Sequence, residues 1–269
     1  MAVLVRPIFG AALLLGLLWS APAGAVFGGK APASNDPIAK AVAAIRYQTD
    51  DGGVHLCTAV ALAPRLVLTA AHCTDGDRGQ LRVIFSPTLS AVPADRIRAV
   101  TDVARARPTA ASKNMYAYQN PDDVALILLA APAPTGTAFA RLAADLPGLA
   151  TLLVAGYGAT SDLRQPDANG HRQLGFDQIL RTASAPLLSS GAALLVTDQT
   201  TRAGTCTGDS GGPAFATGKG PLTIIGIMVG VASPRAVNDY CRGKAYFAAM
   251  PRWRDWIAGS AAAWKQPLP

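Results

Sequence analysis

The stretch TCTGDSGGPAF, residues 205–215, places Ser210 directly after an acidic residue and among glycines. A serine hydroxyl can act as the nucleophile of an acyl transfer when a neighbouring base takes its proton. Gly, Asp and Ser are also ordinary turn residues, so the stretch alone is equally typical of a loop without chemistry. Its interpretation depends on whether a base and an orienting acid stand elsewhere in the chain.

A candidate base stands in LVLTAAHC, residues 66–73. There His72 follows a strand-like run and precedes Cys73, whose disulfide would fix the local backbone. A rigidly held imidazole suits proton abstraction from a serine, although a single histidine is more often structural. The stretch therefore supplies a second component of an acyl-transfer site without establishing it.

A candidate acid stands in NPDDVALILL, residues 120–129, where two aspartates open a strongly apolar run. A carboxylate that enters a buried strand needs a hydrogen-bond donor, because an unpaired buried charge is costly. An imidazole Nδ1–H is a suitable donor, and a turn-capping role is the alternative. The residues themselves leave Asp122 and Asp123 both open.

The whole chain has the composition of a compact globular protein. Its 269 residues are 50% hydrophobic and 15% charged, which suits one large or two small domains. The formal net charge is +7, but the arginines are scattered and the densest basic group, residues 95–108, has no interleaved aromatics. We therefore expect a solvated basic face and no nucleic-acid partner.

The first 25 residues have the pattern of a secretory signal peptide. A single Arg6 precedes an apolar run from Ile8 to Trp19, and the small residues 23–25 resemble a cleavage site. A membrane anchor is the alternative, but the run is short of the roughly 20 residues that a spanning helix needs. We expect a periplasmic or extracellular protein that begins at Val26 and has no stable membrane association after cleavage.

Four cysteines in a secreted chain indicate two disulfides, for which three pairings are possible. The sequential pairing would close one local loop in each half of the chain. There is no Cys-x-x-Cys pair, and only three histidines are present, so a zinc site is not expected. All acidic residues are aspartates, which excludes the helical zinc-hydrolase motif and the EF-hand loop. We expect no metal and no cofactor.

Short apolar or alternating runs separated by Gly, Pro, Asp and Ser favour an all-β sandwich or barrel pair over an alternating α/β protein. A terminal helix is expected within 250–266, and the Pro- and Ala-rich segment 129–148 is the candidate linker. The expected strands are residues 42–47, 65–69, 81–85, 124–129, 152–155, 194–197 and 222–231.

With these motifs together, the sequence resembles the chymotrypsin/trypsin-like serine protease family from Val26 to about Ile257. LTAAHC, DDVALILL and GDSGGP stand in the family's order, VFGGK resembles its mature N-terminus, and VAGYGAT resembles its mid-chain turn. The resemblance implies two six-stranded antiparallel β-barrels, residues 26–140 and 141–269, with the active site in the cleft between them. The C-terminal helix belongs to the second part.

The resemblance also implies a role for each candidate residue. Ser210 is the nucleophile, His72 is the general base and then acid, and Asp123 rather than Asp122 orients the imidazole. The backbone N–H groups of Gly208 and Ser210 form the oxyanion hole, where a glycine lets the chain turn its amide toward the developing charge.

Activation is implied by the same resemblance. In the family, the mature N-terminal amine pairs with the aspartate before the serine, which here predicts a pair between Val26 and Asp209. Because Val26 also follows the predicted signal cleavage site, we expect no propeptide. The implied disulfides are the sequential pairs Cys57–Cys73 and Cys206–Cys241.

The residues of the primary specificity pocket depart from the family pattern. Gly204 stands where trypsin-type members have the aspartate that selects Arg or Lys, so that preference is not expected. Lys244 stands where a small residue is usual, although a one-residue shift would place Gly243 there. If Lys244 or Arg242 points into the pocket, an acidic substrate group would be favoured, and outward-facing solvated side chains are the alternative.

Two further departures concern the strand that contacts substrate and the calcium loop. Residues 229–231 are Val, Gly and Val where the family usually has Ser, Trp and Gly. This change removes a hydroxyl that usually bonds to the triad aspartate. The loop that binds calcium in some members offers only Asp75 and Asp77, so no calcium requirement is expected.

The leading interpretation is a secreted, monomeric serine endopeptidase that acts on polypeptides. One alternative is a weakly active or inactive binding protein on the same fold. Another is an esterase or processing protease with a single target.

Overall fold

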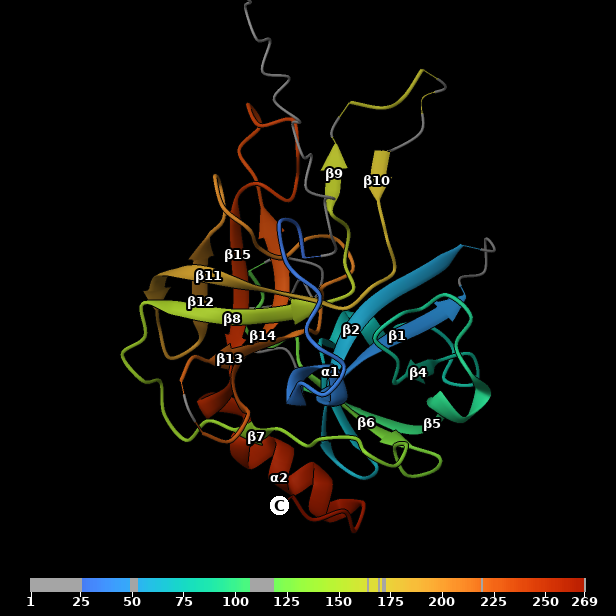
Figure 1. Ribbon diagram of the computed structural model, residues 1–269. Helices are drawn as coiled ribbons and strands as arrows, with labels where there is room; N and C mark the ends of the chain where they lie inside the picture. Colours follow the sequence, from blue (N-terminus) through green and yellow to red (C-terminus); the bar gives the residue numbers. More distant parts are fainter. Residues whose placement is uncertain are drawn as a thin grey trace, which may run out of the picture.

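The computed structural model describes residues 26–48, 53–106, 119–163, 165–168, 170, 173–218 and 220–268. The predicted signal peptide and its cleavage site lie outside these residues, apart from Val26. Two barrels of β-strands lie side by side, the first drawn in blue to green and the second in yellow-green to red (Figure 1). The predicted pair of six-stranded antiparallel barrels is confirmed.

The first barrel closes in the order β1-β2-β3-β6-β5-β4, with β4 pairing back to β1. Its interior is filled by alternate side chains such as Ile45, Val67 and Ile127, which are inaccessible to solvent. A closed barrel has no free sheet edge, so every strand is held on both sides. Its strands are β1 Val42–Gln48, β2 Val54–Ala63, β3 Leu66–Thr69, β4 Arg82–Ile84, β5 Ile97–Arg105 and β6 Ala125–Leu129.

The second barrel follows the order β13-β8-β11-β12-β15-β14 and is closed by pairing of β13 with β14. A short strand, β7 Arg141–Leu142, lies within the expected linker and adds to β14 in parallel. The other strands are β8 Thr151–Gly156, β11 Arg181–Ser190, β12 Leu194–Asp198, β13 Pro213–Ala216, β14 Thr223–Ala232 and β15 Lys244–Ala249. A separate hairpin of β9 Ser161–Leu163 and β10 Gln173–Gly175 projects from the body (Figure 1).

Several strands were missing from the sequence prediction, and their composition explains why. β5 coincides with much of the basic stretch 95–108, where charged side chains interrupt the apolar pattern that predicts a strand. β11 contains Pro186 and many small residues, and it is held by pairing with β8 and β12 rather than by its own hydrophobic pattern. Tertiary pairing therefore outweighed weak local propensity in these strands.

The predicted terminal helix is α2 Arg254–Ala263, which follows a 3₁₀ turn, η3 Met250–Trp253. Ile257 and Trp253 are buried, and the Trp253 indole donates to the carbonyl of Pro121 at 3.1 Å. The C-terminal segment thus packs against the turn that precedes Asp123. The remaining helical elements are α1 Pro37–Ala41, η1 Ala71–Thr74 and η2 Ala94–Arg96.

Among the described residues, none of the helices has both the length and the apolar character needed to cross a bilayer.

Candidate active site

His72 lies in the 3₁₀ turn η1, directly after the buried strand β3. Cys73 is bonded to Cys57 of β2, which fixes the turn against the neighbouring strand and confirms the first predicted disulfide. The backbone N–H of His72 also donates to a carboxylate oxygen of Asp123 at 2.9 Å. The imidazole is therefore held by the strand, the disulfide and the carboxylate.

Asp123 lies at the entrance to β6 and is almost completely buried. Its second oxygen, Oδ2, lies 2.6 Å from His72 Nδ1. Asp122 has a different partner, because its carboxylate lies 2.7 Å from the guanidinium of Arg252. Of the two aspartates that the sequence left open, the structure brings Asp123 to the histidine.

The environment of His72 raises its pKa. Burial acts in the opposite direction and lowers the pKa, but the hydrogen bond to Asp123 and the charge of that carboxylate outweigh it. Asp75 adds a smaller contribution of the same sign. The imidazolium form, which a general base generates when it accepts a proton, is thereby stabilised.

Ser210 lies in the loop before β13 and shares a cavity of about 320 Å³ with His72. Its carbonyl accepts from the Thr58 amide at 2.8 Å, which ties the loop to the first barrel. No hydrogen bond joins the Ser210 hydroxyl to His72 among the described residues. A catalytic serine and its base often tighten their contact only when substrate is bound.

The amides around Ser210 form an alternating pattern. The N–H groups of Asp209, Gly211 and Gly212 donate to backbone carbonyls at 3.0, 2.7 and 2.8 Å. In the described part of the chain, those of Gly208 and Ser210 have no protein acceptor, and both residues line the cavity. Gly208 has a φ of +95°, a conformation that side-chain-bearing residues rarely adopt. Two free donors therefore lie where the sequence predicts an oxyanion hole.

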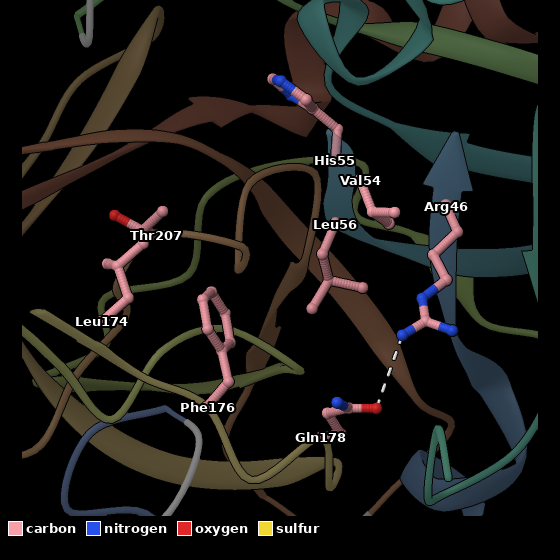
Figure 2. A pocket seen from close by; sticks show the side chains of 8 residues that line it. All are labelled: Arg46, Val54, His55, Leu56, Leu174, Phe176, Gln178 and Thr207. Carbon is pink, nitrogen blue, oxygen red and sulfur yellow. Dashed lines mark hydrogen bonds between the residues drawn. The ribbon is translucent and has the colours of Figure 1, made fainter. Parts of the chain in front are cut away.

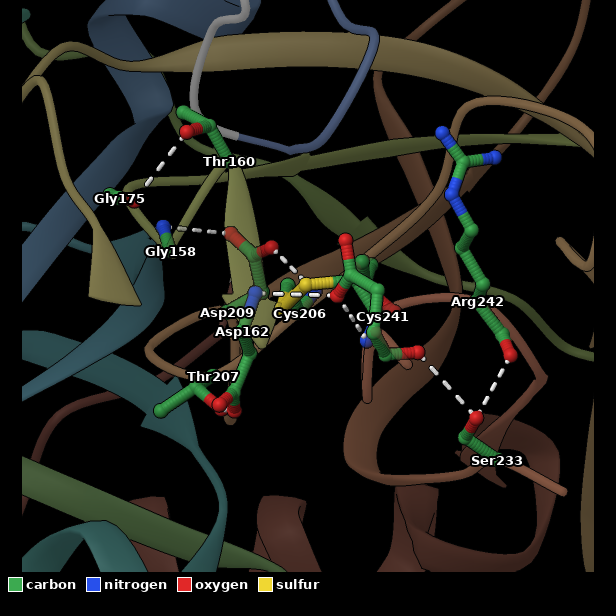
Figure 3. Close-up of a disulfide and its surroundings, with 12 residues drawn as sticks. Gly158, Thr160, Asp162, Gly175, Cys206, Thr207, Asp209, Ser233, Cys241 and Arg242 are labelled. Carbon is green, nitrogen blue, oxygen red and sulfur yellow. Dashed lines mark hydrogen bonds between the residues drawn. A yellow bond between two sulfur atoms is a disulfide. The ribbon is translucent and has the colours of Figure 1, made fainter. Parts of the chain in front are cut away.

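Asp209 is buried, and burial raises its pKa to about 7. The carboxylate accepts from the amides of Gly158 and Cys206, each at 2.8 Å, which offsets part of this effect (Figure 3). No cation pairs with it among the described residues. Val26 is fully buried too, but in this chain its nitrogen belongs to a peptide bond and is not an amine.

Two glycines of the VAGYGAT turn make room for Asp209. A Cβ on Gly158 would lie 2.5 Å from the Asp209 carboxyl carbon and 2.7 Å from its backbone nitrogen. We expect Gly158→Ala to lower the free energy of unfolding by about 1–3 kcal/mol, because an overpacked core must shift its backbone. Urea unfolding of Gly158→Ala and of the control Gly148→Ala, whose Cβ would meet nothing within 4 Å, measures this effect. Equal midpoints for the two variants would contradict the tight packing.

The predicted specificity residues do not line the cavity. Gly204 is buried and pairs with Phe27, and a Cβ there would collide with the side chain of Gln199. Lys244 is exposed at the start of β15, and its direct cross-strand partner is Asp198. Lys244 is therefore exposed to solvent and lies outside this cavity. The other cation considered, Arg242, lies 5.4 Å from the centre of the Phe27 ring.

Sequence reasoning missed an acidic residue in the cavity wall. Asp162 of β9 lines the cavity and accepts from the Thr207 hydroxyl at 2.6 Å (Figure 3). Tyr240 also lines the cavity, and its amide donates to the carbonyl of Asp162. Asp162 lies only two residues after VAGYGAT, but nothing in the sequence indicated that the β9–β10 hairpin would turn back to this wall.

Strand β14 contributes Met228, Gly230 and Val231 to the cavity. One edge of this part of β14 pairs with β15, whereas pairing with β13 ends at Ile227. Val229, which replaces the family's serine, is buried in the core, so it brings no hydroxyl to Asp123. In the described part of the chain, the edge of β14 beyond Met228 has no partner strand on the β13 side, and it is suited to main-chain pairing with an extended peptide.

The second predicted disulfide, Cys206–Cys241, is also confirmed (Figure 3). It joins the loop that carries Gly208 to the segment that carries Tyr240. The one group of described metal-ligand side chains is Cys57, His72 and Cys73, and both of its sulfurs belong to a disulfide. That group is therefore poorly suited to hold a metal ion.

A histidine that is hydrogen-bonded to a buried carboxylate therefore lines one cavity with a serine, and both barrels contribute to this cavity. The sequence profile of the Trypsin family matches residues 27–257. The chain belongs to this family.

Individual relatives agree with this assignment. The chain is 28% identical over 220 residues to brachyurin of Leptuca pugilator, covering 76% of this chain and 87% of that protein. The crystal structure of a scabies mite inactivated protease paralogue has the same fold, with a TM-score of 0.63 and 18% identity. That match covers 87% of this chain and 99% of the other.

Proposed function

We propose that this protein is a serine endopeptidase that hydrolyses peptide bonds through an acyl-enzyme. The observation that carries the proposal is the hydrogen bond between His72 and the buried Asp123, together with one cavity that His72 lines with Ser210 and two amides without an acceptor in the described chain. Membership of the Trypsin family supports the same activity.

In the proposed reaction, the Ser210 oxygen attacks the substrate carbonyl carbon while His72 Nε2 takes the hydroxyl proton. The carbonyl oxygen becomes an oxyanion, and the amides of Gly208 and Ser210 donate to it. Collapse of this intermediate breaks the C–N bond, and His72 gives its proton to the leaving amine. Water, activated by His72, then attacks the ester, and Ser210 regains its proton.

The proposed substrate is a polypeptide in extended conformation, paired with the free edge of β14. Gly204 provides no carboxylate for a trypsin-type preference, and Asp162 adds an acidic group to the cavity wall. The acidic-substrate hypothesis therefore has no support from this cavity. We further propose that the protein is secreted, works as a monomer and gains its Val26 amine by signal-peptide removal.

A binding protein without activity is the second candidate. Two observations favour it: one solved relative is described as an inactivated protease, and Val229 removes a hydroxyl from the neighbourhood of Asp123. The three proposed catalytic side chains are nevertheless all present, and two of them are hydrogen-bonded.

Labelling with a fluorophosphonate tests the proposed function. We expect the intact mass to increase by one probe in the chain that begins at Val26 and to stay unchanged in Ser210→Ala. Because His72 must be neutral to act as a base, the labelling rate is expected to rise with pH, with a midpoint above the 6.5 of an ordinary histidine. Folded, correctly processed protein that takes up no probe would instead support the binding-protein function.

A further inference from the structure

A second hollow, of about 360 Å³, adjoins the candidate active site (Figure 2). We call it the side groove. It shares His55, Leu56 and Thr207 with the cavity that contains Ser210, so the two hollows are continuous. Its remaining lining residues are Arg46, Val54, Leu174, Phe176 and Gln178.

The walls of the side groove are largely apolar. Leu56 of β2 and Phe176, just after β10, extend into it from opposite sides (Figure 2). Phe176 is 40% exposed and Val54 is 63% exposed, so both present apolar surface in the groove. These walls are suited to cover an apolar side chain of a bound peptide.

Arg46 places a cation at one end of the groove. The atom Nε is buried and has no acceptor among the described residues, and the guanidinium makes one long hydrogen bond, 3.5 Å, to Gln178. Some other arginines of the described chain do have a carboxylate partner, as Arg181 has in Asp177. A partly buried guanidinium without a carboxylate attracts an anionic ligand, because burial weakens solvent screening.

Neither of two neighbouring side chains neutralises the charge of Arg46. Arg82 of β4 is the direct cross-strand partner of Arg46, and like charges in this position repel. Gln178 has a φ of +59°, a strained conformation for a residue with a side chain, and its carbonyl accepts from Leu89 at 2.8 Å. The backbone thus holds Gln178 beside Arg46, where its amide adds a polar group to the groove.

The position of the groove shows which part of a substrate reaches it. Leu56 precedes Cys57, whose disulfide to Cys73 lies beside His72, and none of the groove residues comes from β14. In the proposed reaction His72 delivers a proton to the leaving amine, whereas the acyl part pairs with β14. The groove therefore receives the residues on the leaving-group side of the cleaved bond.

We propose that Arg46 determines specificity on this side, by binding a carboxylate of the leaving fragment just after an apolar residue that packs on Leu56 and Phe176. The carboxylate is either the end of the peptide or an acidic side chain. This inference rests on the proposed acyl-enzyme function and adds the class of peptide that the enzyme prefers.

Transfer of the acyl group to added peptides tests the proposal. An N-acyl-alanine nitrophenyl ester forms the acyl-enzyme, and the amine of an added peptide competes with water for it. The amine nitrogen forms a C–N bond, the C–O ester bond breaks, and Ser210 regains a proton through His72. The acceptors are Ala-Leu-Asp-NH₂ against Ala-Leu-Asn-NH₂, and Ala-Leu-OH against Ala-Leu-NH₂.

The ratio of peptide product to hydrolysed acid is measured by chromatography, so it is independent of total activity. We expect the Asp peptide, the free acid or both to be favoured over the matched neutral acceptor about fivefold to tenfold. In Arg46→Gln this preference should fall to about one. The control Arg82→Gln removes a neighbouring charge outside the groove and should retain the preference.

Three results would overturn the proposal: no preference in the unmodified enzyme, a preference retained in Arg46→Gln, or an equal loss of preference in Arg82→Gln. The last result would mean that the general positive potential of this surface, and not Arg46, causes the preference. If the ester is not hydrolysed, the proposed function fails but the groove is still testable. Fluorescence anisotropy of labelled forms of the same peptides on Ser210→Ala protein then measures binding. A carboxylate preference that depends on Arg46 supports the groove, and its absence refutes it.

Discussion

Replacing Ser210 by Ala is expected to lower kcat for peptide hydrolysis by about 10⁶-fold, in line with other serine-protease triads that have lost their nucleophile. The substitution removes the atom that forms the acyl-enzyme, whereas the free amides of Gly208 and Ser210 remain. A residual rate above that of water is therefore expected from the oxyanion site alone. Single-turnover kinetics on a quenched fluorescent peptide measures the loss.

His72→Ala is expected to cost a similar factor, and the double variant little more, because the two residues act in one step. Asp123→Asn should cost about 10⁴-fold, as the same change does in other Ser-His-Asp enzymes. Since Asp123 raises the pKa of His72, this variant should also move the acid limb of the rate profile to lower pH. Independent, multiplying losses in the double variant would contradict a shared proton transfer.

The motifs predicted the fold because each candidate catalytic residue stands in a short sequence that is typical of one local structure. The sequence around His72 predicted a strand followed by a held turn, and the structure has β3, η1 and the Cys57–Cys73 disulfide there. The choice between Asp122 and Asp123 was harder, because both are buried and lie side by side. The resemblance to the family selected Asp123, and the tertiary partners agree with it: Arg252 of η3 pairs with Asp122, and His72 pairs with Asp123.

The walls of the site were much less predictable than its centre. Lys244 was placed by alignment near a pocket, yet the register of β15 against β12 turns it toward Asp198. The side groove combines residues from β1, β2, β10, the segment after β10 and the loop that carries Thr207, so its members range in sequence from Arg46 to Thr207. No local pattern indicates such a combination, because it arises from how the two barrels and the β9–β10 hairpin meet.

The second large effect concerns Asp209 and the peptide bond before Val26. In the chain that retains Ala25, burial holds the pKa of Asp209 near 7, against 3.8 for an ordinary aspartate. The folded state therefore binds a proton that the unfolded state has released between these pH values. Stability is expected to fall as the pH rises from about 4 to about 7, by roughly 4 kcal/mol in total.

A free amine at Val26 is expected to reverse this behaviour. Val26 is already buried, and segment 26–30 is held by bridges from Phe27 to Gly204 and from Lys30 to Thr182. A buried ammonium beside Asp209 would favour the carboxylate and lower its pKa, so the loss of stability toward pH 7 should shrink or disappear. Peptidase activity should be higher in the amine form by about 10²–10³-fold, the effect of one oxyanion donor.

Two chains are compared, one that begins at Val26 and one that begins at Ala25, and both carry Ser210→Ala. Urea unfolding at pH 4 and at pH 7.5 measures how the free energy of unfolding of each chain depends on pH. Asp209→Asn should remove the pH dependence of stability from the Ala25 chain. In chains that keep Ser210, Asp209→Asn should also remove the higher activity of the Val26 chain. The exposed Asp145→Asn is the control, and we expect it to change neither property. If the two chains respond to pH identically and are equally active, the Val26 amine has no part in activation. The buried Asp209 would then organise its loop only through the amides of Gly158 and Cys206.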